Sequence, residues 1–396
     1  MTRKTLPCGL RRFIAALVGL VFLASGLLKL ADPTGTGLIV AEYGKFLHLG
    51  FSTGLAKVLG IVLSLGESLL GIALVSGVLR KIAAWATLVV LGLFSVLTLA
   101  LWIVNPEMDC GCFGEAIHLS HAQSFWKNIV LLGLSLAAFL PLDSIGKPKA
   151  RKWIAAGLAT AGVLIGCIYS NRHLPLVDFT AFAPGAELFA SLDNDYQESD
   201  GYTPAFVYEK DGQQGTFTLD HLPDSSWTFV RADSLYRLPI GRSEQKPILS
   251  FSDAEGNYKD EEAVLGKRVV FSVYRPEKVH WGRLQRHYNA AAKAGGRPLL
   301  LVSGTPESLD AVNVPIELEA FYSDYKTLIT LNRSNGGASY FADGELIGKW
   351  AARDFPKDIA GQLAANPVDL SNHLSSTSRI KAQGFVLYLL AILLLI

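Results

Sequence analysis

Two of the four cysteines in the chain lie one residue apart, in a short segment between two long apolar stretches. The segment reads Asp109-Cys110-Gly111-Cys112-Phe113-Gly114. A thiolate attacks disulfide bonds, and two neighbouring cysteines can close a disulfide of their own. A ring closed by a Cys-x-Cys pair is small and tends to be strained, hence relatively easy to reduce, and the two glycines permit the tight backbone that it needs. The pattern predicts thiol–disulfide exchange at Cys110 and Cys112.

Other residues extend this interpretation or compete with it. Cys167, near the end of a later apolar segment, is a candidate third redox partner that could approach the pair. A metal site is an alternative, because thiolate and imidazole together suit zinc or copper, although the spacing matches no strong zinc pattern. Its ligands would come from one loop: Cys110, Cys112, His118 and His121. A structural disulfide, or two inert thiols, is the remaining interpretation.

Glu67 lies midway in an apolar segment and is the other candidate catalytic residue. A carboxylate near the centre of a bilayer is costly, so it is neutral, paired or turned toward a polar interior. One interpretation is a group that handles protons or contacts a ligand inside a helical bundle. The other is a hydrogen bond that holds two helices together. The sequence gives these two interpretations equal weight.

Several polar and aromatic side chains near the ends of apolar segments are expected to line the same mouth as the cysteine loop. They are Lys29, Asp32, Glu42 and Tyr43. Trp102 and Trp126 flank the loop, and an aromatic belt at the membrane interface explains them better than contact with a quinone or a substrate.

Composition sets the class of protein. Half of the residues are hydrophobic (50%), which indicates a membrane protein that carries a soluble part. The net charge of +1 gives no reason to expect a nucleic-acid partner. Five apolar segments reach or approach the roughly 20 residues that a spanning helix needs, and a shorter sixth ends the chain. They are Phe13–Leu30, Gly54–Val78, Ile82–Val104, Phe125–Pro141, Trp153–Tyr169 and Gly384–Ile396.

The distribution of basic residues predicts the orientation. Lysine and arginine gather before the first segment, between the second and third, and between the fourth and fifth, which places these connections in the cytoplasm. The cysteine loop and residues 171–381 would then face the periplasm, in a multi-pass protein of the inner membrane. The first segment is interpreted as a retained helix rather than a cleaved signal peptide, and Cys8 as an ordinary cytoplasmic thiol.

Residues 173–245 and 246–380 are expected to form two extracytoplasmic parts, divided at the polar stretch 241–246. The first is small and rich in β-structure, with strands predicted at Ala205–Glu209, Thr216–Leu219 and Trp227–Arg231. The second alternates strands and helices. Its strands are predicted at Arg268–Tyr274, Arg297–Ser303, Thr327–Leu331, Ala338–Phe341 and Leu346–Trp350, and its helices at Glu277–Ala294, Pro306–Ala311 and Phe355–Ala364.

This order of elements resembles the α/β thioredoxin fold over about residues 265–365. A redox-active thioredoxin carries Cys-x-x-Cys after its first core strand, but the corresponding residues 274–281 contain no cysteine. The proline that usually faces that motif is also missing from the residues before the hairpin, Ser334-Asn335-Gly336-Gly337. This part is therefore expected to bind, shield or position something. His280, Trp281 and His287 are expected to pack or lie on the surface of one helix rather than form a site.

Three motifs in the first third of the chain resemble the DoxX/MauE family. They are residues 22–33, residues 65–71 beginning Leu65-Gly66-Glu67, and the cysteine segment 109–114. The resemblance covers about residues 13–142 and implies a four-helix membrane bundle over 1–150, often linked to thioredoxin-like partners. Residues 151–172 and 381–396 would add two transmembrane helices. The resemblance also implies a role in thiol or quinone redox, including disulfide supply to exported proteins. A quinone is therefore the candidate cofactor.

Taken together, the sequence predicts an integral membrane thiol-redox protein that acts through Cys110 and Cys112 on the periplasmic side, with Cys167 and Glu67 in support. Its predicted partners are the lipid bilayer and an exported protein, within a membrane complex. The rival hypothesis is a non-enzymatic membrane anchor or assembly subunit whose cysteine-free outer part binds a partner protein.

Overall fold

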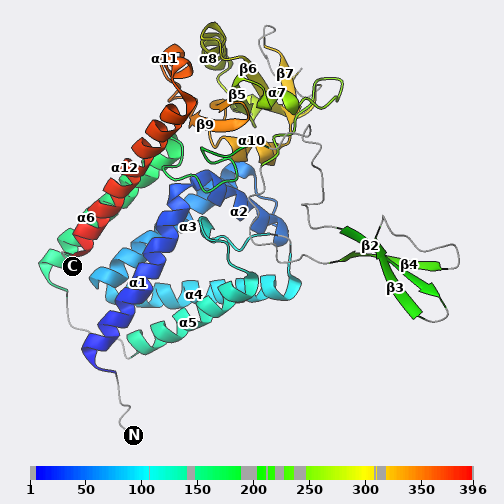
Figure 1. Ribbon diagram of the computed structural model, residues 1–396. Helices are drawn as coiled ribbons and strands as arrows, with labels where there is room; N and C mark the ends of the chain where they lie inside the picture. Colours follow the sequence, from blue (N-terminus) through cyan, green and yellow to red (C-terminus); the bar gives the residue numbers. More distant parts are fainter. Residues whose placement is uncertain are drawn as a thin grey trace.

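The computed structural model describes residues 6–394 except 107, 141–147, 189–202, 211–212, 219–226, 236–246, 307–308 and 310–317. A helical bundle occupies the N-terminal part, and a mixed α/β domain, residues 247–366, lies over one end of it (Figure 1). The polar stretch 241–246, expected to divide the C-terminal part, lies outside the described residues, as does most of the helix predicted at 306–311.

In the described residues before the α/β domain there are six helices. They are α1 (Cys8–Ala31), α2 (Pro33–Phe46), α3 (Thr53–Ser76), α4 (Arg80–Val104), α5 (His121–Phe139) and α6 (Ala150–Arg172). Within the described part of the chain, α1, α3, α4 and α6 are the four helices long and apolar enough to cross a membrane. The protein is therefore a multi-pass membrane protein.

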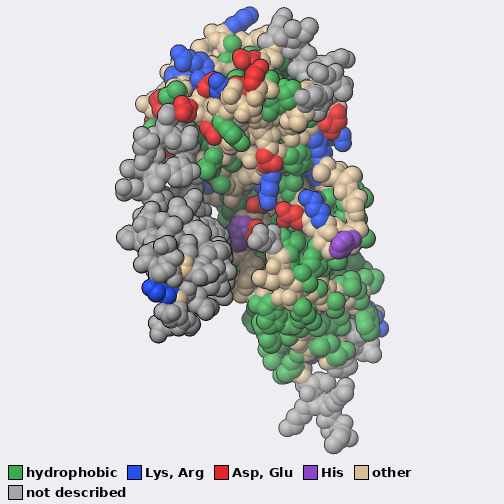
Figure 2. Space-filling model, turned by 90° about the vertical axis from the view of Figure 1, so that its right-hand side faces the viewer, with side chains coloured by type: hydrophobic (Ala, Val, Ile, Leu, Met, Phe, Trp, Pro, Cys, Tyr) green, Lys and Arg blue, Asp and Glu red, His purple; other side chains and the backbone are tan. Residues whose placement is uncertain are grey.

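The surface of the bundle agrees with a lipid environment. Large apolar side chains such as Ile82, Val96 and Ile103 are more than two-thirds exposed, at 67%, 69% and 75%. Figure 2 shows hydrophobic side chains gathered over the lower half of the molecule and charged side chains over the upper half. Several hydroxyls inside the bundle are hydrogen-bonded instead: those of Ser64 and Ser95 donate to carbonyls one turn earlier in their own helices.

Two of the predicted spans differ from the other four. Helix α5 is 19 residues long, but Gln123, Lys127 and Asn128 lie in its first two turns, so its apolar part is short for a bilayer. The predicted final span is the end of a 28-residue helix, α12 (Pro367–Leu394), which begins beside the α/β domain. Neither helix is among the four that meet the length and hydropathy requirement.

Helix α12 returns along α6 (Figure 1). The hydroxyl of Tyr388 donates to the carbonyl of Leu158 at 2.9 Å. The rings of Tyr388 and Phe385 lie against Gly162 and Gly166, where a β-carbon would collide with them or crowd them. Glycines four residues apart let helices approach closely in a membrane. The C-terminal end of the described chain is thereby packed along α6.

Helix α2 was not expected from the sequence. It begins directly after α1, with Pro33 in its first turn and the Asp32 carboxylate accepting the backbone N–H of Gly35 at 2.9 Å. Proline is favoured there, and aspartate is a preferred N-cap. The helix has only 14 residues, so it is too short to cross a membrane. It matters for the site because it carries Tyr43 to the cysteine loop.

The α/β domain contains a five-stranded sheet in the order β7-β6-β5-β8-β9. The strands are β5 (Lys267–Val273), β6 (Pro298–Ser303), β7 (Ala320–Ser323), β8 (Gly337–Ala342) and β9 (Glu345–Trp350). Strands β5, β6 and β7 are parallel, and β8 and β9 form an antiparallel hairpin beside β5. The turn of this hairpin is the predicted Asp343-Gly344, with both residues at positive φ.

Helices cover both faces of this sheet. The remaining elements are α7 (Glu261–Val264), η3 (Pro276–Lys278), α8 (Trp281–Lys293), α10 (Tyr325–Leu331) and α11 (Ile359–Ala364). Alternate side chains of β5 bury on opposite faces: Val269 and Phe271 pack in the cluster with α8 and α11, whereas Val270 packs in the cluster with α10. This three-layer arrangement is an α/β domain.

Most predicted elements of the domain are confirmed, but the strand predicted at Thr327–Leu331 is wrong. These residues belong to helix α10, whose N-cap Asp324 accepts the backbone N–H of Thr327 at 2.8 Å. The β-branched Thr327 and Ile329 favoured a strand, yet Leu328 and Leu331 are three residues apart and bury together as a helix requires. The third parallel strand is instead β7, which the sequence analysis missed.

The small β-rich part is a three-stranded antiparallel sheet in the order β3-β2-β4. Its strands β2 (Thr203–Lys210), β3 (Gln213–Thr218) and β4 (Thr228–Leu235) agree with the three predicted strands. The sheet stands out to one side of the molecule (Figure 1).

Candidate functional site

The cysteine segment lies between α4 and α5 at the end of the bundle nearest the α/β domain. Helix α4 ends at Val104, its C-cap Asn105 adopts a left-handed conformation, and α5 is preceded by a capping box formed by Ser120 and Gln123. Between them the chain forms the short strand β1 (Cys112–Glu115). The two helix ends thus fix both sides of the loop that carries the cysteines.

The thiol pair, Cys110 and Cys112, has its two Sγ atoms 3.3 Å apart. Cys110 is buried and Cys112 is partly exposed. Gly111 between them has a φ of +61°, and a β-carbon there would collide with Ile39. A glycine is therefore needed at this position. A disulfide bond is about 2.05 Å long, so closing the pair takes a sulfur displacement of only about 1.3 Å.

The environments of the two sulfurs differ. The contact between the two sulfurs is the largest influence and, with the nearby charges of Lys127 and Lys29, lowers the pKa of Cys112 to about 5. The same interaction, together with burial, raises the pKa of Cys110 far above its usual range. These opposite shifts favour the thiolate at Cys112 and the thiol at Cys110.

Tyr43 and Lys127 complete the surroundings of the pair. The Tyr43 hydroxyl donates to the backbone carbonyl of Cys110 and lies 3.9 Å from its sulfur. Burial raises the pKa of Tyr43, so it remains a neutral donor. The Lys127 ammonium lies 4.9 Å from the centre of the Phe113 ring, a cation–π contact next to Cys112.

A buried ion pair inside the bundle contacts the same loop. The Lys29 ammonium lies 2.7 and 2.8 Å from the two carboxylate oxygens of Glu67, and both side chains are buried. The Ser25 hydroxyl is within hydrogen-bond distance of the Glu67 carboxylate (2.8 Å) and of the Cys112 carbonyl (2.7 Å). Helices α1 and α3 are thereby connected to the backbone of Cys112.

Breaking this ion pair from one side is expected to cost stability. Glu67→Leu leaves the Lys29 charge buried without its partner, which is expected to destabilise the fold by about 3–5 kcal/mol. The double variant Lys29→Met, Glu67→Leu removes both charges and should recover most of that loss. Unfolding in detergent, followed by circular dichroism, measures both effects. Additive losses in the double variant would contradict the pairing.

A second set of ion pairs joins the α/β domain to the cysteine strand. Arg333, at the end of α10, bonds to Asp32 at 2.8 Å and to Glu115 of β1 at 3.1 Å, and its side chain is only 5% exposed. An exposed pair between Lys326 and Glu42 lies beside it, at 3.5 Å. Arg333 therefore links the end of β1, three residues after Cys112, to the start of α2.

The structure places the other predicted site residues apart from the pair. Cys167 packs in an apolar cluster of α1, α3, α6 and α12 with Leu30 and Val163, and no contact with the thiol pair is found. His118 is exposed and lies 3.3 Å from Asp109, and His121 contacts the carbonyl of Pro106. Among the described residues no three Cys, His, Asp or Glu side chains come together as metal ligands. The four-ligand metal site is not formed.

Of the residues expected at the mouth, Tyr43 contacts Cys110, and Lys29 bonds to Glu67 and Ser25 next to the loop. Asp32 and Glu42 instead pair with Arg333 and Lys326 of the α/β domain. Trp102 and Trp126 remain partly exposed beside Phe125, as a belt requires. The sequence analysis missed Ser25, Lys127 and Arg333. Ser25 and Lys29 are four residues apart on one helix face, a spacing that could have indicated their shared contact. Arg333 carried no such signal.

Comparison with known families bears on this bundle. The family model described as "Methylamine utilisation protein MauE" matches residues 9–141. Residues 9–141 are thus similar to the MauE family. The match spans α1 to α5 and therefore includes the thiol pair, Ser25, Lys29 and Glu67. It confirms the MauE part of the resemblance.

The matched region is about a third of the chain, and the rest has few matches. The model of a domain of unknown function, DUF8463, matches residues 202–236, which contain the three-stranded sheet. No curated protein matches the chain. No solved structure matches it either. The thioredoxin-like fold of residues 265–365 accordingly stays a prediction, with which the sheet order is compatible.

Proposed function

We propose that this membrane protein exchanges thiol and disulfide equivalents through Cys110 and Cys112. The observation that carries the proposal is that the two sulfurs lie 3.3 Å apart, in surroundings that shift their pKa values in opposite directions. The pKa of Cys112 is lowered and that of Cys110 is raised. A low-pKa, partly exposed thiol beside a buried one is the arrangement of an attacking and a resolving cysteine.

The exchange proceeds in two displacements. The Cys112 thiolate attacks one sulfur of a partner disulfide, forms a mixed disulfide and releases the other partner sulfur as a thiolate. Cys110 then attacks Cys112, its proton passes to a partner thiolate, and the Cys110–Cys112 bond forms as the mixed disulfide breaks. The partner gains two electrons and the pair loses two. Run in reverse, the oxidised pair delivers a disulfide to a partner dithiol.

The setting we propose is the inner membrane, with the thiol pair and residues 171–381 in the periplasm. The division is a bundle over 1–150, a further helix over 151–172, extracytoplasmic parts over 173–245 and 246–380, and a terminal helix from 381. The description of the matching family refers to methylamine utilisation. For this chain we infer a task in the maturation of an exported protein. Cys167 lies in an apolar cluster, so Cys110 takes the resolving role.

Thiol trapping tests the proposal directly. The purified full-length protein is equilibrated with reductant or with oxidant, and its free thiols are alkylated with a reagent that shifts its mobility. We expect two interconverting forms that differ by two thiols, and a single form in the Cys110→Ser, Cys112→Ser double variant. A pair locked in one state under both conditions would overturn the proposal.

The depressed pKa of Cys112 predicts an unusual pH profile. Only the thiolate reacts, so the alkylation rate of Cys112 by iodoacetamide should fall as pH drops through about 5 and stay level from neutral to alkaline pH. Free cysteine in the same assay should instead react faster up to about pH 8.5. Lys127→Met should move the Cys112 midpoint upward. A midpoint at that of free cysteine contradicts the assigned thiolate.

The assembly hypothesis keeps one observation in its favour. The three-stranded sheet of residues 203–235 stands to one side of the bundle and the α/β domain, as a partner-binding element would (Figure 1). The Cys110→Ser, Cys112→Ser variant separates the two functions. Full function with copurification of the partner retained would favour assembly. Lost function with an intact complex would favour redox work.

A further inference from the structure

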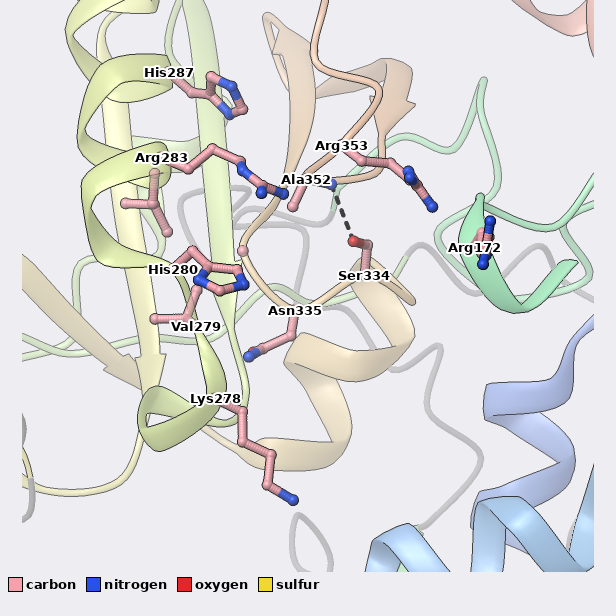
Figure 3. Close-up of a pocket in the computed structure, with 12 residues that line it drawn as sticks. Arg172, Lys278, Val279, His280, Arg283, His287, Ser334, Asn335, Ala352 and Arg353 are labelled. Carbon is pink, nitrogen blue, oxygen red and sulfur yellow. Dashed lines mark hydrogen bonds between the residues drawn. The ribbon is translucent and has the colours of Figure 1, made fainter. Parts of the chain in front are cut away.

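A second cavity lies in the α/β domain, away from the thiol pair. Its volume is about 230 Å³, and basic side chains line it: Arg172, Lys278, His280, Arg283, His287 and Arg353. Figure 3 shows the residues of α8 and of the turn before it along one wall, with Ser334 and Arg353 across the opening. No acidic residue is among its lining residues.

The fold explains why these side chains meet. The cavity lies where the chain leaves the carboxyl end of β5 for η3 and α8, the edge at which α/β sheets bind ligands. Arg172, the last residue of α6, is placed there because the neighbouring His173 pairs with Asp354 at 2.7 Å. The carboxylate of Asp354, which follows Arg353 in the chain, is therefore already paired with His173.

The donors at the cavity have no acidic partner. Among the described residues no ion pair is found for Arg172, Lys278, Arg283 or Arg353, so four side chains with a formal positive charge line the cavity without an acidic partner. Helix α8 has 13 residues, and its N-cap His280 makes no capping hydrogen bond with its side chain. Its first N–H groups add to the positive potential. Consistent with this, burial first and then Arg283 and Arg286 lower the pKa of His287.

We propose that this cavity binds a dianion of the phosphate class, either free phosphate or the phosphate group of a monoester. A single carboxylate would leave most of the positive charge along the cavity wall unbalanced, whereas a dianion carries two charges on oxygens that arginine recognises in pairs. The cavity is small for a drug-sized ligand, which limits the bound part to one such group and its nearest atoms. This site is separate from the proposed thiol chemistry.

Titration of the full-length protein in a zwitterionic detergent tests the proposal. Inorganic phosphate, glycerol 3-phosphate and acetate are compared by calorimetry near pH 8, where the dianion prevails, at constant ionic strength. We expect saturable binding of one phosphate-class ion, and acetate at least tenfold weaker. A tighter fit of glycerol 3-phosphate assigns the site to monoesters, and a tighter fit of phosphate assigns it to the free ion. Equal binding of acetate, or no saturation, overturns the proposal.

Variants locate the binding. The double variant Arg283→Gln, Arg353→Gln should weaken phosphate binding at least tenfold. Lys293→Gln is the control for a lost charge elsewhere on α8, since it removes one positive charge from the far end of the helix, about 15 Å from Arg283, and should change binding less than twofold. If the double variant fails to fold, Lys278→Gln replaces it. Unchanged phosphate binding in a folded cavity variant overturns the assignment. Unchanged binding in the Cys110→Ser, Cys112→Ser variant supports the independence of the site.

Discussion

Replacing Cys112 with serine is expected to lower the rate of exchange with a disulfide probe by about a thousandfold or more, because a hydroxyl cannot replace the thiolate as a nucleophile. Cys110→Ser should behave differently. Cys112 still attacks, but the mixed disulfide with the probe accumulates because the sulfur 3.3 Å away that would resolve it is gone. Mass spectrometry of the intact protein distinguishes the two outcomes.

Controls for this pair of variants come from the other two cysteines. Cys8 is exposed at the start of α1, and Cys8→Ser should leave the rate unchanged. Cys167→Ser should not accumulate the mixed disulfide, since Cys167 lies in the α6 and α12 cluster. Accumulation in Cys167→Ser, or in Cys112→Ser instead of Cys110→Ser, would contradict the roles assigned to the two sulfurs.

Replacing Arg333 with methionine is expected to release the α/β domain from the cysteine strand. Two carboxylates, Asp32 and Glu115, lose the cation between them, and removing one partner of a buried charge cluster costs about 3–5 kcal/mol. The end of β1 is then held less firmly, so Cys112 should react faster with iodoacetamide. Thermal unfolding in detergent and the alkylation rate of Cys112 measure the two effects.

Lys326→Met is the matched control, because Lys326 also joins the α/β domain to the bundle but is exposed. An exposed pair is worth less than about 1 kcal/mol, so this variant should remain close to the parent protein. Arg333→Lys should fall between the two, since one ammonium cannot reproduce the two directed bonds of the guanidinium. Equal effects of Arg333→Met and Lys326→Met would show that Arg333 does not fix the cysteine strand.

The sequence by itself determined the class of the protein and the residues at its centre. Hydrophobic segments predicted the helices of the bundle other than α2, since a bilayer imposes both length and composition on a span. Alternating apolar residues and the Asp343-Gly344 turn predicted the strands of the α/β domain, apart from β7 and the segment that became α10. The unusual Cys-Gly-Cys spacing is by itself sufficient to indicate the candidate site.

The tertiary structure alone decided how that site is built. Whether Cys167, His118 or His121 joins the cysteine pair depends on where helices and loops of distant sequence meet, which spacing does not encode. The lowered pKa of Cys112 comes from a neighbouring sulfur and charges on two helices, and Arg333 reaches the loop from more than 200 positions away along the chain. Packing brings such residues together because burial selects their neighbours, and local sequence patterns record only contacts within one helix, strand or turn.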